Sequence, residues 1–344
     1  MAMVTLKDIA KATGKSITTV SRALNDYDDV SAATKVLVRR VAADLGYVPN
    51  IVAQRLQKQH TDTIGLILPT FGPRFSDPFF SELLAGVGNR AADLGYDLLV
   101  ATRAPGEEET KAYCSMVQGG QVDGFVLVRT RRKDARIECL KNANYPFVAF
   151  GRAEAGYDFP YVDEDGVYAM QLVVKHLVAL GHRRIACIAP PPELMFAAYR
   201  KQGFLEEMKK ANIEMDAALF RVGDLTQRDG YEQASALMDL PDPPTAIVSC
   251  NDLMAFGAMS AAQDRGLVVG KDISITGFDD IPMAEHSHPS LTTVHQPIYQ
   301  IGSMVCEMLI QLIRGEELKE KHILLKPALI ARQSSGVLTN ENRR

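Results

Sequence analysis

Residues 4–25 read VTLKDIAKATGKSITTVSRALN and decide the architecture of the first part of the chain. Thr5, followed by Asp8 three positions later, has the pattern of a helix N-cap. Apolar residues then recur with helical spacing until Gly14 interrupts them, and Ser16 offers a second N-cap. The same spacing resumes over residues 17–24. The stretch therefore predicts two short helices joined by a three-residue turn, which is a helix-turn-helix.

The sequence that follows completes a small all-α domain. Ser31 is a further N-cap, and the apolar pattern after it runs to Leu45-Gly46, where the glycine is typical of a helix end. Residues 51–58 are compatible with a fourth helix, but a helix of this length is marginal when isolated. We therefore expect this segment to fold only when something holds it.

From residue 63 onward, apolar strands alternate with amphipathic helices, which is typical of βαβ units around parallel sheets. The expected strands are 63–68, 97–101, 122–128, 147–151, 184–189, 219–222, 246–250 and 273–278. The expected helices are 79–94, 107–118, 134–142, 165–180, 194–211, 227–238 and 252–265. This number of βα units is larger than one ordinary doubly wound domain contains. We therefore expect two separate sheets.

Charge is distributed unevenly along the 344 residues. Residues 1–60 hold nine Lys or Arg and five Asp, a balance of +4, whereas the remainder holds 29 against 37, a balance of −8. A small basic segment attached to a larger acidic body is typical of a module that meets a polyanion. Neither a membrane-length apolar run nor a secretory signal is found, and we expect the protein in the cytoplasm.

Motifs for catalysis, metals or disulfides are weak. The five cysteines are scattered without a Cys-x-x-Cys pair, which favours buried reduced thiols over disulfides or zinc. Gly14-Lys15-Ser16 resembles the end of a phosphate-binding loop, but Ile9 stands where its first glycine belongs. His286 and His288 have no further ligands nearby in the sequence. We expect no catalytic residues, no metal and no cofactor.

Nine motifs in order resemble the lactose-repressor/galactose-repressor (LacI/GalR) family of bacterial transcription regulators. They are VTLKDIA at 4–10, TVSRALN at 19–25, LGYVPN at 45–50, DPFF at 77–80, GHRRI at 181–185, RKQGF at 200–204, ND at 251–252, GFDD at 277–280 and LTTVHQ at 291–296. The resemblance covers residues 4–336. It implies a helix-turn-helix headpiece and a body with the α/β fold of periplasmic binding proteins, made of two parallel-sheet lobes.

On this resemblance we expect three domains. The headpiece would be residues 1–49, the hinge helix and linker 50–60, and the effector-binding and dimerisation domain 61–338. Within the body, the first lobe would take about 61–160 and 291–321, and the second about 161–290 and 322–338.

The resemblance implies that the second helix enters the major groove of operator DNA. Arg22 could donate to guanine O6 and N7, whereas Ile17 and Thr18 offer little for base readout. The alternative is that Arg22 is an ordinary solvent-exposed charge on the protein surface and does not read a base. The expected DNA-binding residues are Thr5, Ser16, Ile17, Thr18, Ser21, Arg22, Asn25, Ser31, Tyr47, Asn50, Ala53, Gln54 and Leu56.

The hinge helix of the family is implied to enter the minor groove as a symmetric pair, with Leu56 as a wedge between base steps. A near-palindromic operator and a homodimer follow from such a pair. Replacing Leu56 with alanine should lower operator affinity and leave effector binding intact, whereas a Leu56 that only packs on the body would leave operator affinity unchanged.

The resemblance places an effector site between the lobes, with Phe80, Arg200, Asn251, Asp279 and Gln296 as contacts. Their donors and acceptors suit a polyol, and a phenylalanine can cover the apolar face of a sugar. Plainer interpretations exist for three of them: Arg200 could pair with surface carboxylates, Asp279 could cap a turn, and Phe80 could be core.

Two further features bear on the effector. Many sugar-sensing members carry an aromatic residue where this chain has Leu225. The charged segment 129–136 is similar to relatives associated with α-glucosides or oligosaccharides, although a solvated charge run is its default interpretation.

We therefore expect a DNA-binding repressor of carbohydrate-utilisation genes that a sugar, such as an α-glucoside or an oligosaccharide, releases from its operator. The alternative is a purine or phosphorylated corepressor that promotes DNA binding, and Asp279 argues mildly against a phosphate. A sugar-modifying enzyme with a DNA-binding module is a third interpretation, which turnover of bound sugar would distinguish.

Overall fold

The computed structural model describes residues 4–48, 60–70, 77–154, 156 and 158–338. The chain divides near residue 61 into two compact units, a small headpiece and a larger body. The expected hinge, with Asn50, Ala53, Gln54 and Leu56, lies outside the described residues. In the part that is described, no helix combines the length and the apolar character of a membrane span.

The described part of the headpiece, residues 4–48, contains three helices, as the sequence predicts: α1 (Leu6–Thr13), α2 (Ile17–Leu24) and α3 (Ala32–Asp44). The Asp8 carboxylate accepts the Thr5 backbone N–H at 2.8 Å, and Ser16 accepts the Thr19 N–H at 3.0 Å. Residues 14–16 make the turn, with Gly14 at φ +63°. Ile9, Val20 and Val38 are fully buried where the three helices meet.

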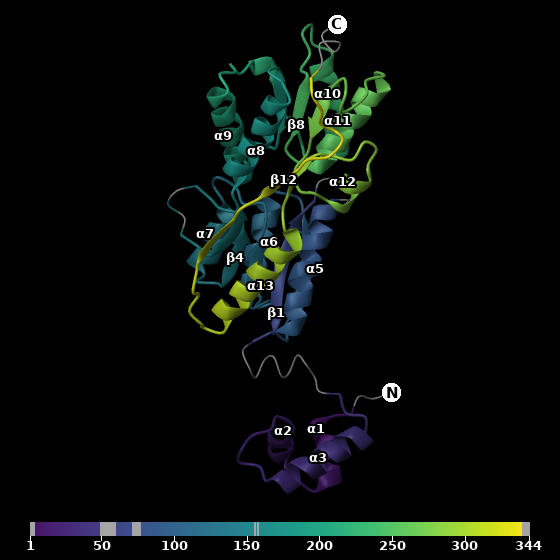
Figure 1. The fold of residues 1–344 in the computed structure, drawn as a ribbon. Helices are drawn as coiled ribbons and strands as arrows, with labels where there is room; N and C mark the ends of the chain where they lie inside the picture. The colour runs from purple at the N-terminus through teal and green to yellow at the C-terminus, as the bar shows by residue number, and fades with distance from the viewer. Residues whose placement is uncertain (1–3, 49–59, 71–76, 155, 157, 339–344) are drawn as a thin grey trace. The chain divides into compact units, whose positions relative to one another are not determined.

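The first lobe of the body is a six-stranded parallel sheet in the order β11-β5-β4-β3-β1-β2 (Figure 1). Its strands are β1 (Thr63–Pro69), β2 (Asp97–Arg103), β3 (Gly124–Leu127), β4 (Phe147–Phe150), β5 (Tyr161–Glu164) and β11 (His322–Leu325). Along β1, Ile64, Leu66 and Leu68 face one core, whereas Ile67 faces another. This alternation arises because successive strand residues point to opposite faces.

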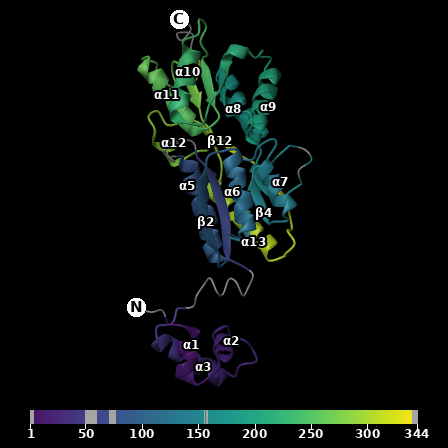
Figure 2. The ribbon, with the colours of Figure 1, turned by 180° about the vertical axis from the view of Figure 1, so that it is seen from behind.

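Two pairs of helices cover the two faces of this sheet. On one face lie α5 (Pro78–Asp93) and α13 (Ile298–Ile313), whose side chains share the core of Leu66. On the other lie α6 (Glu107–Gln118) and α7 (Ala135–Asn142), which share the core of Ile67. Figure 2 shows β2 at the sheet's edge beside α5.

The second lobe is a four-stranded parallel sheet in the order β7-β6-β8-β9. Its strands are β6 (Ile185–Ala189), β7 (Phe220–Val222), β8 (Ala246–Ser249) and β9 (Ser274–Thr276), and its helices are α8 (Gly166–Ala179), α9 (Met195–Lys210), α10 (Gln227–Met238), α11 (Asp252–Asp264) and the short α12 (Pro282–His286). Helices α8 and α9 pack together, as do α10 and α11. Close backbone approach at Gly203 and Gly257 makes both pairings possible.

The chain crosses between the lobes three times. It passes from β5 into α8, returns through β10 (Thr293–His295) into α13, and leaves β11 for β12 (Ala328–Ile330). Strands β10 and β12 pair antiparallel. Because β5 and β11 belong to the first sheet, that sheet extends beyond the limits of 160 and 321 expected for the first lobe. Strand β5 and helix α13 had no counterpart among the elements expected from hydrophobic patterning.

The expectation for the cysteines was wrong in one respect. Cys114 of α6 and Cys139 of α7 form a disulfide between the two helices that cover one face of the first sheet. Cys187, Cys250 and Cys306 are buried and free, as expected. The positions 114 and 139 come together only through the packing of α6 against α7, so the bond cannot be recognised from their spacing along the chain.

Candidate functional site

A cavity lies between the two lobes of the body. The first lobe lines it with Asp77, Phe79, Val128, Arg129, Thr130, Phe150, Gly151, Arg152, Asp163 and Glu164, and the second lobe and the crossings with Phe196, Arg200, Leu225, Asn251, Asp279 and Gln296. Most of these residues lie at or just beyond the carboxyl ends of β3, β4, β5, β7, β8 and β9. That edge is where open parallel sheets place their ligands.

Three ion pairs dominate the electrostatics of the cavity. Arg129 Nη2 lies 3.0 Å from Asp77 Oδ2, and Arg152 Nε lies 2.6 Å from Asp163 Oδ2. The third pair joins the lobes, because Arg200 Nη2 of α9 lies 3.0 Å from Glu164 Oε1 of β5. Each arginine among the described lining residues is thus already opposite a carboxylate.

The pair formed by Arg200 and Glu164 leaves polar atoms without partners. Glu164 Oε2 and Arg200 Nε are buried, and neither has a hydrogen-bond partner. Burial raises the pKa of Glu164 to about 7, although the Arg200 guanidinium opposes the shift. A buried acceptor and a buried donor beside one cavity are what a ligand rich in hydroxyl groups could satisfy.

Arg200 is held rigidly within the cavity wall. Its Nη1 donates to the Cys250 carbonyl, and its guanidinium carbon lies 3.5 Å from the centroid of the Phe278 ring and 4.7 Å from that of Phe196. Arg200 does not form the alternative ion pair with surface carboxylates, because its partner is Glu164 across the lobe interface.

Asn251, Asp279 and Gln296 also line the cavity. Asn251 caps α11 by accepting the Met254 N–H at 2.9 Å, and it donates to the Leu225 carbonyl at 2.9 Å. Gln296 Nε2 donates to Asp279 Oδ1 at 2.7 Å. Burial raises the pKa of Asp279 well above its usual range, and the backbone there takes the positive φ of +122°.

The fifth residue expected at the effector site does not line the cavity. Phe80 is fully buried in the core between α5 and the sheet, and the neighbouring Phe79 reaches the cavity instead. Leu225 does line it, and aromatic surface comes from Phe79, Phe150 and Phe196. None of these three phenylalanines was predicted as a contact from the sequence.

Other lining residues missed by sequence reasoning share one signal. Arg129 and Arg152 directly follow the expected strands 122–128 and 147–151, and the carboxyl ends of parallel strands meet at one edge. Applying this rule to every strand would have found both. Asp163 and Glu164 belong to β5, a four-residue strand that the hydrophobic pattern did not reveal.

In the headpiece, the expected contact residues gather around α2. Ser16, Ile17, Thr18 and Arg22 are exposed, with 45% of Ile17 accessible to solvent, whereas Ser21 is half-buried. Asn25 is exposed and donates to the Ser21 carbonyl at 2.9 Å. These exposed side chains are therefore accessible to a partner, whereas Val20 and Ala23 of the same helix are buried in the headpiece core.

The remaining headpiece candidates are less exposed or serve as caps. Thr5 and Ser31 are exposed N-caps of α1 and α3, and Tyr47 is half-buried against the headpiece core. Arg22 Nη2 lies 2.8 Å from Asp29 Oδ2, and its guanidinium carbon lies 5.2 Å from the Tyr27 ring centroid. Both partners are exposed, so this weak surface pair leaves Arg22 available to a stronger acceptor.

Within the described parts of the chain, no cluster of three or more His, Cys, Asp or Glu side chains could hold a metal ion. His286 and His288 are both exposed.

Comparison with known proteins identifies both units. Residues 5–50 match the family described as bacterial regulatory proteins, lacI family, and residues 174–335 match a periplasmic binding protein-like domain. The HTH-type transcriptional repressor CytR of Escherichia coli strain K12 is 35% identical over 335 residues, which are 97% of either chain.

Two solved structures extend the comparison. A lac repressor dimer bound to operator and the anti-inducer ONPF has a TM-score of 0.86 at 30% identity, covering 97% of this chain and all of the other. A complex of the transcriptional regulator CelR with cellobiose has a TM-score of 0.74 at 32% identity, covering 96% and 100%.

Proposed function

This chain belongs to the LacI family of bacterial regulatory proteins and is a DNA-binding transcriptional regulator, and we propose that it represses carbohydrate-utilisation genes until a neutral sugar occupies its inter-lobe cavity. In this proposal it acts in the cytoplasm as a homodimer on a near-palindromic operator. The solved lac repressor that it resembles is a dimer bound to operator, which supports that assembly.

The pairing of every cavity arginine with a carboxylate carries the proposal for a neutral effector. Asp77, Asp163 and Glu164 already face the three guanidinium groups, and Asp279 adds a fourth carboxyl. At each guanidinium among the described lining residues a phosphate would therefore have to compete with a carboxyl group, and desolvating it there would be costly. Hydroxyl groups, which both donate and accept, match this mixture of acceptors and donors.

The CelR complex with cellobiose supports the same class of ligand, because that regulator shares the fold over nearly the whole chain. We propose Arg200, Asn251, Asp279 and Gln296 as polar contacts, with Glu164 added. Phe79 and Phe196 would cover apolar faces of the sugar. We also propose that the ligand is bound and not turned over, which a search for product after incubation with cellobiose would check.

A thermal-shift screen tests the effector class directly, because a ligand that binds only the folded protein raises its Tm. We expect neutral mono- or disaccharides, with cellobiose as the first probe, to raise Tm, and sugar phosphates to leave it unchanged. Phe196→Ala should abolish the shift, whereas Phe220→Ala, at a half-buried phenylalanine outside the cavity, should retain it. Stabilisation only by purines or phosphates would overturn the proposal.

Release from DNA is the second part of the proposal. The sugar that raises Tm should lower the affinity for operator DNA, measured by fluorescence anisotropy at fixed salt. A ligand that tightens operator binding would instead identify it as a corepressor.

A further inference from the structure

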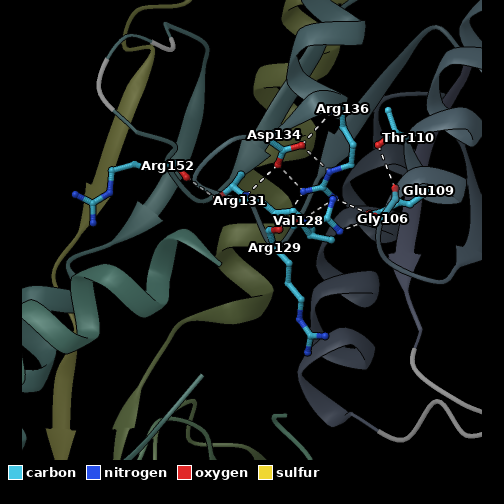
Figure 3. A network of polar contacts seen from close by, with 10 residues as sticks. Gly106, Glu109, Thr110, Val128, Arg129, Arg131, Asp134, Arg136 and Arg152 are labelled. Atoms are coloured by element: carbon cyan, nitrogen blue, oxygen red, sulfur yellow. Dashed lines mark hydrogen bonds and ion pairs between the residues drawn. The ribbon is translucent and has the colours of Figure 1, made fainter. Parts of the chain in front are cut away.

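The segment 129–136 contains four arginines and a lysine. Of its charged residues only Arg132 and Lys133 are exposed, so the segment as a whole is not a solvated charge run. Arg136 is completely buried, and Figure 3 shows it at the centre of a polar network with Glu109 and Asp134. Its Nε and Nη2 donate to the two oxygens of Asp134 at 2.9 and 2.7 Å, and its Nη1 donates to Glu109 Oε1 at 2.6 Å. Arg131 also contacts Glu109, so two cations balance two carboxylates.

The two remaining donors of Arg136 hold the backbone of the cavity wall. Nη1 donates to the Val128 carbonyl at 3.2 Å, and Nη2 donates to the Arg129 carbonyl at 3.0 Å. All five N–H groups of the guanidinium are therefore used. Arg129 takes a φ of +50°, which is unfavourable for a residue with a side chain and needs support from its surroundings. That backbone position directs the Arg129 side chain towards Asp77 in the cavity.

Residues 130–132 also connect the two lobes through hydrogen bonds, at a place separate from the three chain crossings. The Arg132 N–H donates to the Glu193 carbonyl at 3.0 Å, and the Met195 N–H donates to the Thr130 carbonyl at 2.9 Å. Residues 131 and 194 form an antiparallel bridge between these two bonds. Asp134 holds the backbone of residues 130–132 in position, because its Oδ2 accepts the Arg131 N–H at 3.0 Å.

We propose that Arg136 is a positioning residue for effector binding: its buried guanidinium fixes residues 128–132, which supply one wall of the cavity and clasp the second lobe at residues 193–195. The clasp adds to the contacts that already cross the cavity, which are the Glu164–Arg200 ion pair and the Arg152 guanidinium stacked on Tyr199. Its two hydrogen bonds stabilise the arrangement of the lobes that this structure shows. The inference rests on the proposed function only in naming the cavity as the effector site.

Hydrogen exchange of the full-length protein without ligand tests the clasp. In Arg136→Lys, which keeps the charge but not the five-donor fork, we expect about five- to tenfold faster exchange in residues 130–133 and also in 193–196. Helix α5, which packs on the other face of the sheet, should keep its protection. Arg228→Lys, at an exposed arginine paired with Glu232 on α10, is the matched control and should change nothing in either segment.

The exchange at 193–196 separates positioning from a local structural role. A residue that only stabilised its own loop would alter residues 130–133 and leave the other lobe unchanged, and that result would overturn the proposal. Absence of protection at 193–196 in the unaltered protein would overturn it equally.

A second variant keeps the proposal testable if Arg136→Lys fails to fold. Met195 is the first residue of α9, where proline is well tolerated, and Leu194 before it has the extended φ and ψ of −77° and 133° that a following proline requires. Met195→Pro therefore removes the clasp donor and spares the helix. Met195→Ala truncates the same side chain and retains the N–H.

We expect Met195→Pro to speed exchange in residues 130–133 about five- to tenfold relative to Met195→Ala. Equal exchange in the two variants would refute the clasp. Cellobiose titration by calorimetry is then done separately on the unaltered protein. If no heat of cellobiose binding were detected, that result would count against the proposed effector class. The exchange measured without ligand would still decide the role of Arg136.

Discussion

Replacing Glu164 with glutamine removes a buried carboxyl that links the stability of the body to pH. Burial raises the pKa of Glu164 from the ordinary 4.5 to about 7, and Arg200 across the cavity only partly opposes this. Between pH 4.5 and 7, the folded protein therefore retains a proton that the unfolded chain has lost. The free energy of unfolding must fall as pH rises through this window.

The size of the effect follows from the difference of about 2.5 between the two pKa values. At about 1.4 kcal/mol per pKa unit, ionising Glu164 costs the folded state about 3 kcal/mol at pH 8 relative to pH 4.5. Glutamine does not titrate. The stability of Glu164→Gln relative to the unaltered protein should therefore rise by about 3 kcal/mol over this range, on top of a pH-independent cost for losing the partner of Arg200.

Urea unfolding followed by circular dichroism at pH 4.5, 5.5, 6.5 and 8, at one protein concentration, measures this difference. Asp252, whose pKa burial also raises and which is not among the groups coupled to Glu164, titrates in both proteins, so its contribution cancels to first order. A difference between the two proteins that stays constant with pH would refute the assignment of a raised pKa to Glu164.

Two further predictions concern the headpiece and the packing of the second lobe. Arg22→Ala should weaken operator binding about 5- to 150-fold in fluorescence anisotropy, the loss expected for one bidentate contact to guanine, and should weaken binding to random DNA far less. An equal loss on both DNAs, as expected for the control Lys15→Ala, would reduce Arg22 to a phosphate contact. Gly203→Ala should lower the free energy of unfolding by about 1–3 kcal/mol in urea melts, because its Cβ would lie 2.2 Å from the Val167 carbonyl oxygen between α9 and α8. Gly88→Ala, whose Cβ meets nothing closer than 3.8 Å, should be neutral or stabilising, and a similar cost at both positions would contradict this explanation.

Hydrophobic period and capping residues predicted most of the elements because both signals are local. Thr5, Ser16 and Ser31 mark the starts of the headpiece helices within a few residues of the groups they cap. The same signals overlooked β5, which spans only four residues, and α13, which follows a crossing between the lobes.

The residues that line the candidate cavity were likewise predicted from the sequence only in part. The motifs that carry the family resemblance supplied Arg200, Asn251, Asp279 and Gln296, and all four line the cavity. They also suggested Phe80, whereas Phe79 lines it, because a shift of one residue on a helix turns the side chain by about 100°.

The sequence by itself determined the headpiece helices, the alternation of strands and helices and the family of the chain, since each depends on residues close together or on motifs read in order. Only the tertiary structure decided that Glu164 meets Arg200, that Cys114 meets Cys139, and that Arg136 is buried beneath the cavity wall. These facts depend on which faces of distant elements pack together. The sequence does not distinguish a charged residue that is surrounded by water from one that is paired with a buried carboxylate. Tertiary packing alone determines which of these environments the residue has.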